Sequence, residues 1–212
     1  MNGNFMDADL RSVQQARDLA VAAREAMRAF QFAPQEEVDR ICEAMVAAGM
    51  REAGRLGQLA HEETGFGYPE HKRLKNEFAA QGVWDSIKDI PTCGVLRRDD
   101  ALKIIEVGAP VGVLCALTPS TNPTSTAFFK ILIGVKARNA VVVAPHPSAK
   151  NCTAEAVRVM AAVDQATIRM RDAVLAGLGI ALLPDFSARE AIGRGLVQEL
   201  LPGWRPVDVF AE

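Results

Sequence analysis

Residues Val111 to Ala144 decide the fold, and they read VGVLCALTPSTNPTSTAFFKILIGVKARNAVVVA. The two ends of this stretch, 111–117 and 139–144, are apolar runs typical of strands that are buried on both faces. The segment between them, 124–137, has the pattern of a helix. A strand, a helix and a strand in this order predict a βαβ crossover with parallel strands.

Helical patterns precede the crossover. Apolar residues recur at spacings of three and four along three stretches that proline or glycine separates. The predicted helices cover 8–32, the stretch from Pro34 to the glycines of EETGFGYP at 62–69, and 70–88. The first carries Leu10, Val13, Ala20, Ala23, Met27 and Phe30, and the third carries Leu74, Phe78, Trp84 and Ile87.

The pattern changes after Pro91. KIIEV at 103–107 reads as another strand, and 151–162 reads as a helix beyond the crossover. Helices followed by alternating strands and helices predict an α/β fold. We expect a truncated doubly wound parallel sheet, half of a nucleotide-binding domain, preceded by an N-terminal helical region.

Composition excludes several classes of function. The 212 residues suffice for one large domain or two small ones, and 49% hydrophobic with 24% charged residues is ordinary for a soluble protein. A net charge of −2 does not favour a nucleic acid or an anionic membrane as partner. Neither a membrane-length apolar run nor a signal peptide is evident, so we expect a cytoplasmic protein.

Cysteine and histidine spacings argue against a metal site. The cysteines are far apart and form no CxxC, which also disfavours a disulfide framework. They are Cys42, Cys93, Cys115 and Cys152. The histidines, His61, His71 and His146, show no pairing typical of metal ligands.

The loop inside the crossover is the first candidate site. Asn122 followed by Pro123 is a favourable helix start, and we expect the Asn122 side chain to accept from the backbone N–H of Thr124 or Ser125. Capping does not account for the run of hydroxyls at 124–126. Ligands bind beyond the carboxyl ends of parallel strands, and helix N-termini favour anions. No GxGxxG is present, so a ligand site and a plain helix start remain alternatives.

A second loop, PHPSAKN at 145–151, follows the next parallel strand and should lie beside the first. His146 and Lys150 suit a phosphate or an adenosine group, although a surface histidine and a solvated lysine explain them equally well. Cys152 sits near a helix N-terminus, where the pKa of a thiol can be lowered. The simpler interpretation of Cys152 is an ordinary residue in the first helical turn.

Five segments between residues 61 and 150 carry a family resemblance. They read HEETGFG, EHKRLKN, PTCGVLRRDD, PVGVLCALTPSTNPTSTAFFK and ARNAVVVAPHPSAK, in that order. Together they resemble the N-terminal part of CoA-acylating aldehyde dehydrogenases, a group that includes the aldehyde half of bifunctional aldehyde–alcohol dehydrogenases and the sulfoacetaldehyde dehydrogenases. The resemblance extends over about residues 8–160 and implies a Rossmann-like NAD(P)-binding domain.

The resemblance also implies a reaction. In that family an aldehyde and coenzyme A are converted with NAD or NADP into an acyl-CoA, or the reverse. A cysteine thiolate attacks the carbonyl, a hydride passes to the nicotinamide, and the thioester is transferred to coenzyme A. The implied small-molecule partners are therefore an aldehyde and coenzyme A.

By resemblance, the loop from Thr118 to Thr126 lies near the nicotinamide and the reacting carbonyl, with Asn122 as the candidate that stabilises the oxyanion. The implied cofactor-binding residues are Thr118, Pro119, Thr121, Asn122, Thr124, His146 and Lys150. Two positions depart from hydrolytic relatives. Their asparagine falls opposite Thr121, and the lysine that holds their adenine ribose falls opposite Ala144.

The resemblance ends before the family's nucleophile, and none of the four cysteines occupies that place, so we expect no full turnover. Residues 169–206, with AGLGIALLPDF and LVQELLPGW, resemble instead the C-terminal end of the effector domain of LysR-type regulators. The predicted division is a partial dehydrogenase domain at 1–163, helical to about residue 90, and a foreign helix–strand–helix tail at 164–212. A strand at 180–183 would extend the sheet.

Three functions follow from these resemblances. The first is an oxidoreductase of the acylating aldehyde dehydrogenase family, in a truncated or fused form. The second is a non-catalytic remnant that still binds a nucleotide. The third, a small-molecule-sensing regulator, is weakest because no helix-turn-helix segment precedes the tail. Oligomerisation is left open, since the family's oligomerising tail is not recognised.

Overall fold

The computed structural model describes residues 8–161, 181–182 and 198–199, and the account below concerns these residues. The helices are α1 (Ala8–Phe30), α2 (Gln35–Thr64), α3 (Pro69–Glu77), the π-helical turn η1 (Phe78–Gly82), α4 (Val83–Ile87), α5 (Pro123–Lys136), the 3₁₀ turn η2 (Pro147–Ala149) and α6 (Lys150–Ala161). The strands are β1 (Gly94–Asp99), β2 (Ile104–Gly108), β3 (Val113–Thr118), β4 (Ala140–Pro145), β5 (Ala181–Leu182) and β6 (Gln198–Glu199).

The predicted crossover is confirmed. Strands β3 and β4 pair in parallel from Val113 opposite Ala140 to Thr118 opposite Pro145, and α5 joins them. Both strands are buried along almost their whole length, which explains why their sequences show apolar runs rather than alternation. The helix and strand ends agree with the sequence-based boundaries to within about two residues.

Two short strands extend the sheet, whose order among the described residues is β5-β4-β3-β6, all parallel. Strand β5 pairs with β4, as predicted for residues 180–183. Strand β6 pairs with the opposite edge, on β3, and was not predicted. The remainder of the tail at 164–212, with its two predicted helices, lies outside the described residues.

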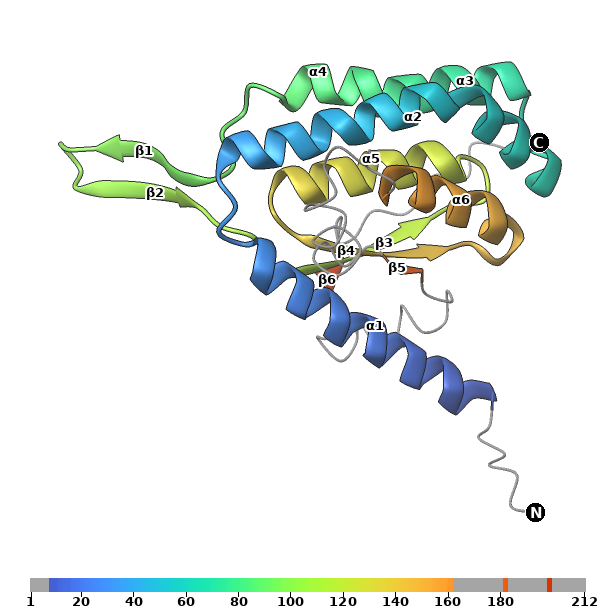
Figure 1. Ribbon diagram of the computed structural model, residues 1–212, viewed down its shortest axis with the longest axis horizontal. Coiled ribbons are helices and arrows are strands. Elements are labelled where there is room, and N and C mark those ends of the chain that lie inside the picture. The colour runs from blue at the N-terminus through green and yellow to red at the C-terminus, as the bar shows by residue number, and fades with distance from the viewer. Residues whose placement is uncertain (1–7, 162–180, 183–197, 200–212) are drawn as a thin grey trace, which may run out of the picture.

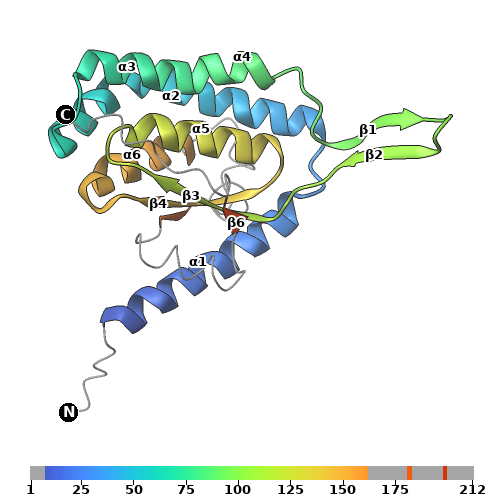
Figure 2. The same ribbon diagram turned by 180° about the vertical axis from the view of Figure 1, so that it is seen from behind.

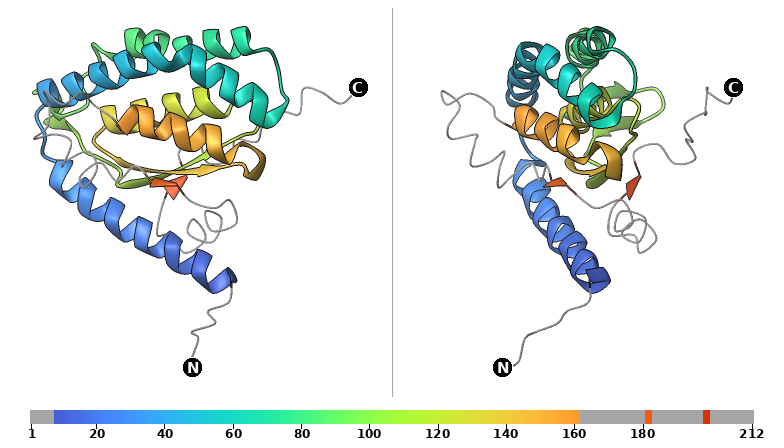
Figure 3. Two further views of the ribbon diagram at one scale, coloured as in Figure 1. Left: turned by 45° about the vertical axis from the view of Figure 1, so that its right-hand side comes forward. Right: turned by 90° about the vertical axis from the view of Figure 1, so that its right-hand side faces the viewer.

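Helices cover both faces of the β3–β4 pair in successive layers (Figure 1). Helix α1 lies on one face, α5 and α6 lie on the other, and α2 with α3 and α4 packs over α5 and α6 (Figure 3). The larger core, on the α5 and α6 side, contains Phe128, Ile131 and Leu132, all fully buried. Consecutive strand residues point to opposite faces, so the same two strands supply both cores.

The core beneath α1 is built from small side chains. Ala16, Ala20 and Ala23 pack against Cys115 and Val142 on the second face of the sheet. Alanine lets a helix approach a sheet closely, since it has no longer side chain to accommodate. The predicted helix is confirmed, but its Leu10 is 61% exposed, so that residue does not belong to the buried face.

Helix α2 ends as the sequence predicts. Gly65 adopts the left-handed conformation, with φ of 70°, and its N–H donates to the carbonyl of His61 at 2.8 Å. Helices α2 and α3 then pack very closely. A Cβ on Gly57 would lie 2.8 Å from the backbone nitrogen of Arg73, so this position requires glycine.

The third predicted helix differs from the expectation of one regular helix. A π-helical turn at 78–82 interrupts it, and an extra residue in the turn rotates the helical face. Leu74 and Phe78, which the prediction took as part of its apolar pattern, are 50% and 71% exposed. The residues of α3 that are buried are polar, Lys72 and Asn76. The periodicity of apolar residues therefore indicated the helix but not its buried side.

A β-hairpin projects from the body of the molecule (Figure 2). Strand β2 is the strand predicted at 103–107, and β1, in the segment PTCGVLRRDD, was not predicted. The two pair antiparallel, with a bulge between Val95 and Arg97. Most of their side chains are exposed, so neither strand has the buried face that an alternating pattern would report.

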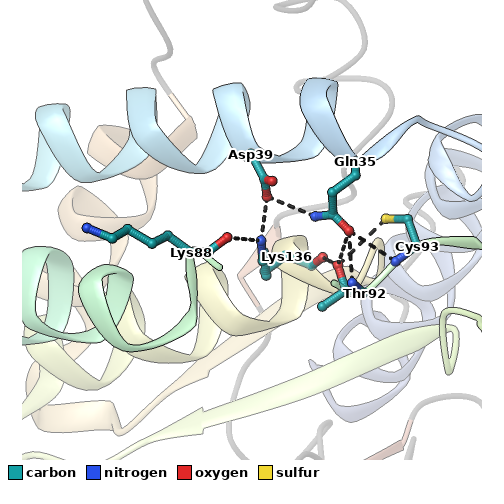
Figure 4. Close-up of polar contacts among 6 residues, drawn as sticks. All are labelled: Gln35, Asp39, Lys88, Thr92, Cys93 and Lys136. Atoms are coloured by element: carbon teal, nitrogen blue, oxygen red, sulfur yellow. Dashed lines mark hydrogen bonds and ion pairs between the residues drawn. The ribbon is translucent and has the colours of Figure 1, made fainter. Parts of the chain in front are cut away.

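A polar network joins the start of α2, the end of α5 and the segment leading to the hairpin (Figure 4). The side chain of Lys136 is only 3% exposed, and its Nζ donates to Asp39 at 2.5 Å and to the carbonyl of Lys88 at 2.9 Å. The Oε1 of Gln35 accepts from the backbone N–H groups of Thr92 and Cys93. The network satisfies buried and half-buried polar groups from these three parts of the chain.

We predict that Lys136→Met lowers the free energy of unfolding by about 2 kcal/mol or more. It removes a buried donor and leaves Asp39 with only the amide of Gln35. Lys88→Met is the matched control, because its ammonium pairs with Asp85 at the surface and should contribute less than about 0.5 kcal/mol. Urea unfolding measures both, and equal losses would contradict the role of Lys136.

Candidate functional site

Two loops leave the carboxyl ends of β3 and β4 side by side. The backbone N–H of His146 donates to the carbonyl of Thr118 at 3.0 Å, which ties the starts of the loops together. The Thr118 side chain is 5% exposed, and its hydroxyl has no hydrogen-bond partner among the described residues. Such an unpaired buried hydroxyl is rare and requires a cause. From α5, the Nζ of Lys130 reaches the carbonyl of Leu117 at 2.7 Å.

Asn122 stands at the predicted helix start but does not cap the helix. Helix α5 begins at Pro123, as expected, yet the side chain of Asn122 accepts no bond from the first turn. Its Oδ1 accepts instead from the Nζ of Lys75 on α3, at 2.9 Å. The predicted bond to the N–H of Thr124 or Ser125 is therefore wrong. A bond to an ammonium is stronger than a neutral one, and Lys75 takes the oxygen that a cap would use.

Lys72, one helical turn before Lys75, also reaches this loop. It is 5% exposed, and its Nζ donates to the carbonyl of Thr121 at 2.9 Å. Burial, followed by the charge of Lys75, lowers the pKa of Lys72. Sequence reasoning missed both lysines as site residues. The segment EHKRLKN, noted only for its family resemblance, was the available signal.

Thr124 is used inside the fold. Its hydroxyl donates to the Oδ1 of Asn76 at 2.8 Å, and the Nδ2 of Asn76 donates to the carbonyl of Ala53 at 3.0 Å. Both side chains are buried. This chain of bonds fixes the first turn of α5 against α3 and α2, and so sets the position of Asn122.

A cavity of about 430 Å³ opens between α3, η1, α4 and the first turns of α5. It is lined by Leu74, Lys75, Phe78, Ala79, Val83, Asn122, Ser125, Thr126 and Phe129. The exposed Leu74 and Phe78 thus form one wall of it. The cavity takes residues from the loop at 118–126 but none from 145–150, so the single groove expected for both loops is not this cavity.

The second loop is held by its own residues and by α2. The Nδ1 of His146 accepts from the backbone N–H of Ser148 at 3.2 Å and is bonded to its hydroxyl at 2.8 Å. At the start of α6, the N–H groups of Asn151 and Cys152 donate to the two carboxylate oxygens of Glu63, at 2.8 and 2.6 Å. Lys150 is exposed.

Glu63 was not recognised as a site residue from the sequence, although it belongs to the HEETGFG segment. Burial raises the pKa of its carboxyl group, but the N–H donors of Asn151 and Cys152 outweigh burial and lower the pKa overall. The carboxylate occupies the helix N-terminus that an anionic ligand would use.

Cys42 and Cys152 are not activated thiols. Burial, followed by the carboxylate of Glu63, raises the pKa of Cys152 to about 12. The lowered pKa considered for Cys152 is therefore wrong, and the simpler interpretation holds. Burial also raises the pKa of Cys42 to about 12. Cys115 is buried, and Cys93 is half-buried.

No helix within the described residues is long and apolar enough to cross a membrane. Within the same residues, no cluster of histidine, cysteine and carboxylate side chains is arranged to hold a metal ion.

Comparison with known sequences found acylating aldehyde dehydrogenases. The bifunctional aldehyde-alcohol dehydrogenase AdhE of Escherichia coli is 39% identical over 149 residues, which are 70% of this chain and 17% of that protein. The acylating sulfoacetaldehyde dehydrogenase of Bilophila wadsworthia is 35% identical over 142 residues, 66% of this chain and 31% of the relative. No family model matches the chain. The chain thus spans less than a third of the length of these relatives.

Solved structures agree. An acetylating aldehyde dehydrogenase from Geobacillus thermoglucosidasius superposes with a TM-score of 0.81 and 44% identity, over 91% of this chain and 42% of that one. A probable aldehyde dehydrogenase from Listeria monocytogenes gives 0.79 and 37%, over 88% and 40%. These matches confirm the predicted fold class. They give no support to the resemblance of residues 169–206 to LysR-type regulators. Most of residues 169–206 lie outside the described part of the chain.

We predict that Glu63→Gln lowers the free energy of unfolding at pH 7 by about 1 kcal/mol, because it removes the charged cap of α6. The folded-state pKa of Glu63 is lowered. Its contribution is therefore complete above the unfolded pKa, about 4.3, and is lost as the pH falls through the folded value. The difference between wild type and variant should shrink in acid.

Glu62→Gln is the matched control, since Glu62 is exposed and, among the described residues, its side chain bonds only with Gln58 one turn away. Denaturant unfolding at neutral and acid pH measures all three proteins. A loss for Glu63→Gln that stays constant with pH, or one shared by Glu62→Gln, would argue against the cap.

Proposed function

We propose that this chain supplies the NAD(P)-binding part of a CoA-acylating aldehyde dehydrogenase, and that it binds the nucleotide weakly and without turnover. The homologues are enzymes of this type, and the fold of the described residues matches their cofactor-binding domain. The observation that carries the proposal is the unpaired, buried hydroxyl of Thr118 at the carboxyl end of β3. In open parallel sheets, this edge is where ligands bind.

The residues at this edge fit one end of the cofactor. An unpaired buried hydroxyl costs about 1–3 kcal/mol, and a bond to a ligand would recover that cost. We assign the nicotinamide end to Thr118, Pro119, Thr121 and Asn122. When bound, NAD(P) would supply the hydride acceptor of an aldehyde oxidation. Thr124, a further candidate from the sequence, supports this loop through its bond to Asn76.

The chain offers fewer groups that could bind the phosphate and adenosine end of the cofactor. The carboxylate of Glu63 occupies the N–H groups at the start of α6, so this helix offers no free N-terminus to a phosphate. The Nδ1 of His146 is engaged by Ser148. The exposed ammonium of Lys150 is then the cation that we assign to the phosphate or adenosine end. Weak binding follows, because affinity depends on how many such contacts the site supplies.

Catalysis in this family requires a thiolate, and neither Cys42 nor Cys152 provides one. With the pKa of Cys42 and Cys152 near 12, both are protonated at neutral pH. This observation favours the second candidate function, a non-catalytic nucleotide-binding remnant, over an active enzyme with aldehyde and coenzyme A as substrates. The third, a small-molecule-sensing regulator, gains nothing from the comparisons.

The division of the chain remains part of the proposal. We place a partial dehydrogenase domain at 1–163 and a separate tail at 164–212, with a cytoplasmic location and no nucleic-acid partner. Strand β5, which comes from the tail, pairs with β4 and supports a tail that adds to the sheet edge.

We predict no CoA-dependent aldehyde oxidation by the purified chain, because the thiols of Cys42 and Cys152 are protonated at neutral pH and the remaining site residues give only residual rates. The measurement is NADH absorbance with an aldehyde and coenzyme A, alone and together. Cys152→Ala is the control. Steady NADH production that needs both substrates and survives this replacement would overturn the prediction.

Binding of NAD should be millimolar or weaker, as measured by calorimetry. Thr118→Val is expected to weaken it roughly fivefold, because the hydroxyl loses its bond to the ligand, while leaving the free protein as stable or more stable. Lys150→Ala should also weaken it. Thr92→Val is the control for hydroxyl removal, since Thr92 bonds within the network at Lys136. Micromolar binding that none of Thr118, His146 or Lys150 affects would place the site elsewhere.

A further inference from the structure

The side-chain amide of Asn122 has a defined direction. Its contact atom for Lys75 is assigned as Oδ1, at 2.9 Å from Nζ. An ammonium group has three donors and no acceptor, so only the amide oxygen can face it. The Nδ2 group therefore points away from Lys75, and it has no hydrogen-bond acceptor among the described residues. Asn122 and Lys75 both line the cavity beside α5.

The surroundings of Asn122 carry positive charge. Lys72 donates to the neighbouring carbonyl of Thr121, and neither Lys72 nor Lys75 forms an ion pair within the described part of the chain. The first turn of α5 adds the positive end of a helix that no side chain caps. At the start of α6, by contrast, the Glu63 carboxylate satisfies the N–H groups. Of the two helix starts, the one at Asn122 is the electropositive one.

We propose that Lys75 is a positioning residue that holds the Asn122 carboxamide with its N–H donors toward the cavity, where they bind the oxygen of a carbonyl or carboxylate group. Bonding of the amide oxygen to an ammonium polarises the N–H groups and strengthens them as donors. The cavity is also lined by the apolar side chains of Leu74, Phe78, Val83 and Phe129, which suit a short hydrocarbon substituent.

The positive charge also sets a preference. Lys72 and Lys75 favour an oxygen that carries negative charge over a neutral one. This is the electrostatic condition for stabilising an oxygen on which charge develops. This proposal rests on the proposed function in one respect, which is that the bound oxygen is taken to be the carbonyl oxygen of an aldehyde. The donor geometry and its charge preference stand without it.

The test follows the side-chain amide resonances of Asn122 by nuclear magnetic resonance in the ¹⁵N-labelled full chain, identified by their loss in Asn122→Ala. Acetate is the anionic probe and acetamide the neutral one. Acetate should shift these resonances at lower concentration than acetamide. Lys75→Met should weaken the acetate effect roughly tenfold, and Lys75→Arg, which keeps the charge and a donor, should restore part of it.

Lys75 is exposed, so we expect its replacement to leave the fold intact, and Lys88→Met controls for the loss of one surface charge elsewhere. A merely structural role for Lys75 would change stability but not the acetate response. The proposal is overturned if acetate acts equally on wild type and Lys75→Met, or if it leaves the Asn122 resonances unmoved. Failure of NAD binding with an intact acetate response would remove the proposed function and leave this assignment standing.

Discussion

The parallel pairing of β3 with β4 is the constraint on which the rest of the structure depends. A tight turn cannot join parallel strands, so α5 must cross from one to the other. Because both strands are apolar on both faces, each face must be covered, by α5 and α6 on one side and by α1 on the other. Helices α2 to α4 then bury the outer sides of α5 and α6. Alternation along the strands divides their side chains between the two cores.

The same pairing brings two helix starts together at one edge of the sheet. Charged side chains from other helices contact both starts, but the charge is negative at one and positive at the other. A carboxylate from α2 closes the start of α6. Ammonium groups from α3 approach the start of α5, whose own first turn is already positive. Like charges gathered in this way repel one another, and a bound anion would relieve that repulsion. The start of α5 is therefore the more electropositive of the two helix starts, and it is where we propose that a ligand oxygen binds.

The described residues include groups suited to binding a ligand, but Cys42 and Cys152 are not suited to reacting with one. The loop with an unpaired hydroxyl, an oriented amide and two neighbouring lysines is the place where we propose that a ligand binds. Burial keeps the thiols of Cys42 and Cys152 protonated at neutral pH, so neither is activated as a nucleophile. Since the chain matches only part of the length of its relatives, similarity to active enzymes is an argument for fold and ligand class rather than for turnover.

The sequence by itself determined the helical regions before residue 90, the βαβ crossover with the helix that follows it, and the position at which α5 begins. These depend on local periodicity, proline and glycine, which act within a few residues. It also indicated which loops carry polar residues. It did not report the exposed strand β1, because a strand without a buried face has no alternation to detect.

Only the tertiary structure decided the direction of Asn122, the buried face of α3 and the closing of α6 by Glu63. In each case the deciding partner is far away in sequence: Lys75 for Asn122, Thr121 for Lys72, and Asn151 for Glu63. From local preference alone, Asn122 was predicted to cap α5 through a side-chain bond to a backbone N–H, which is worth about 1 kcal/mol. An ammonium brought in by the packing of α3 forms a stronger bond, and chain packing rather than local sequence therefore sets the chemistry of the site.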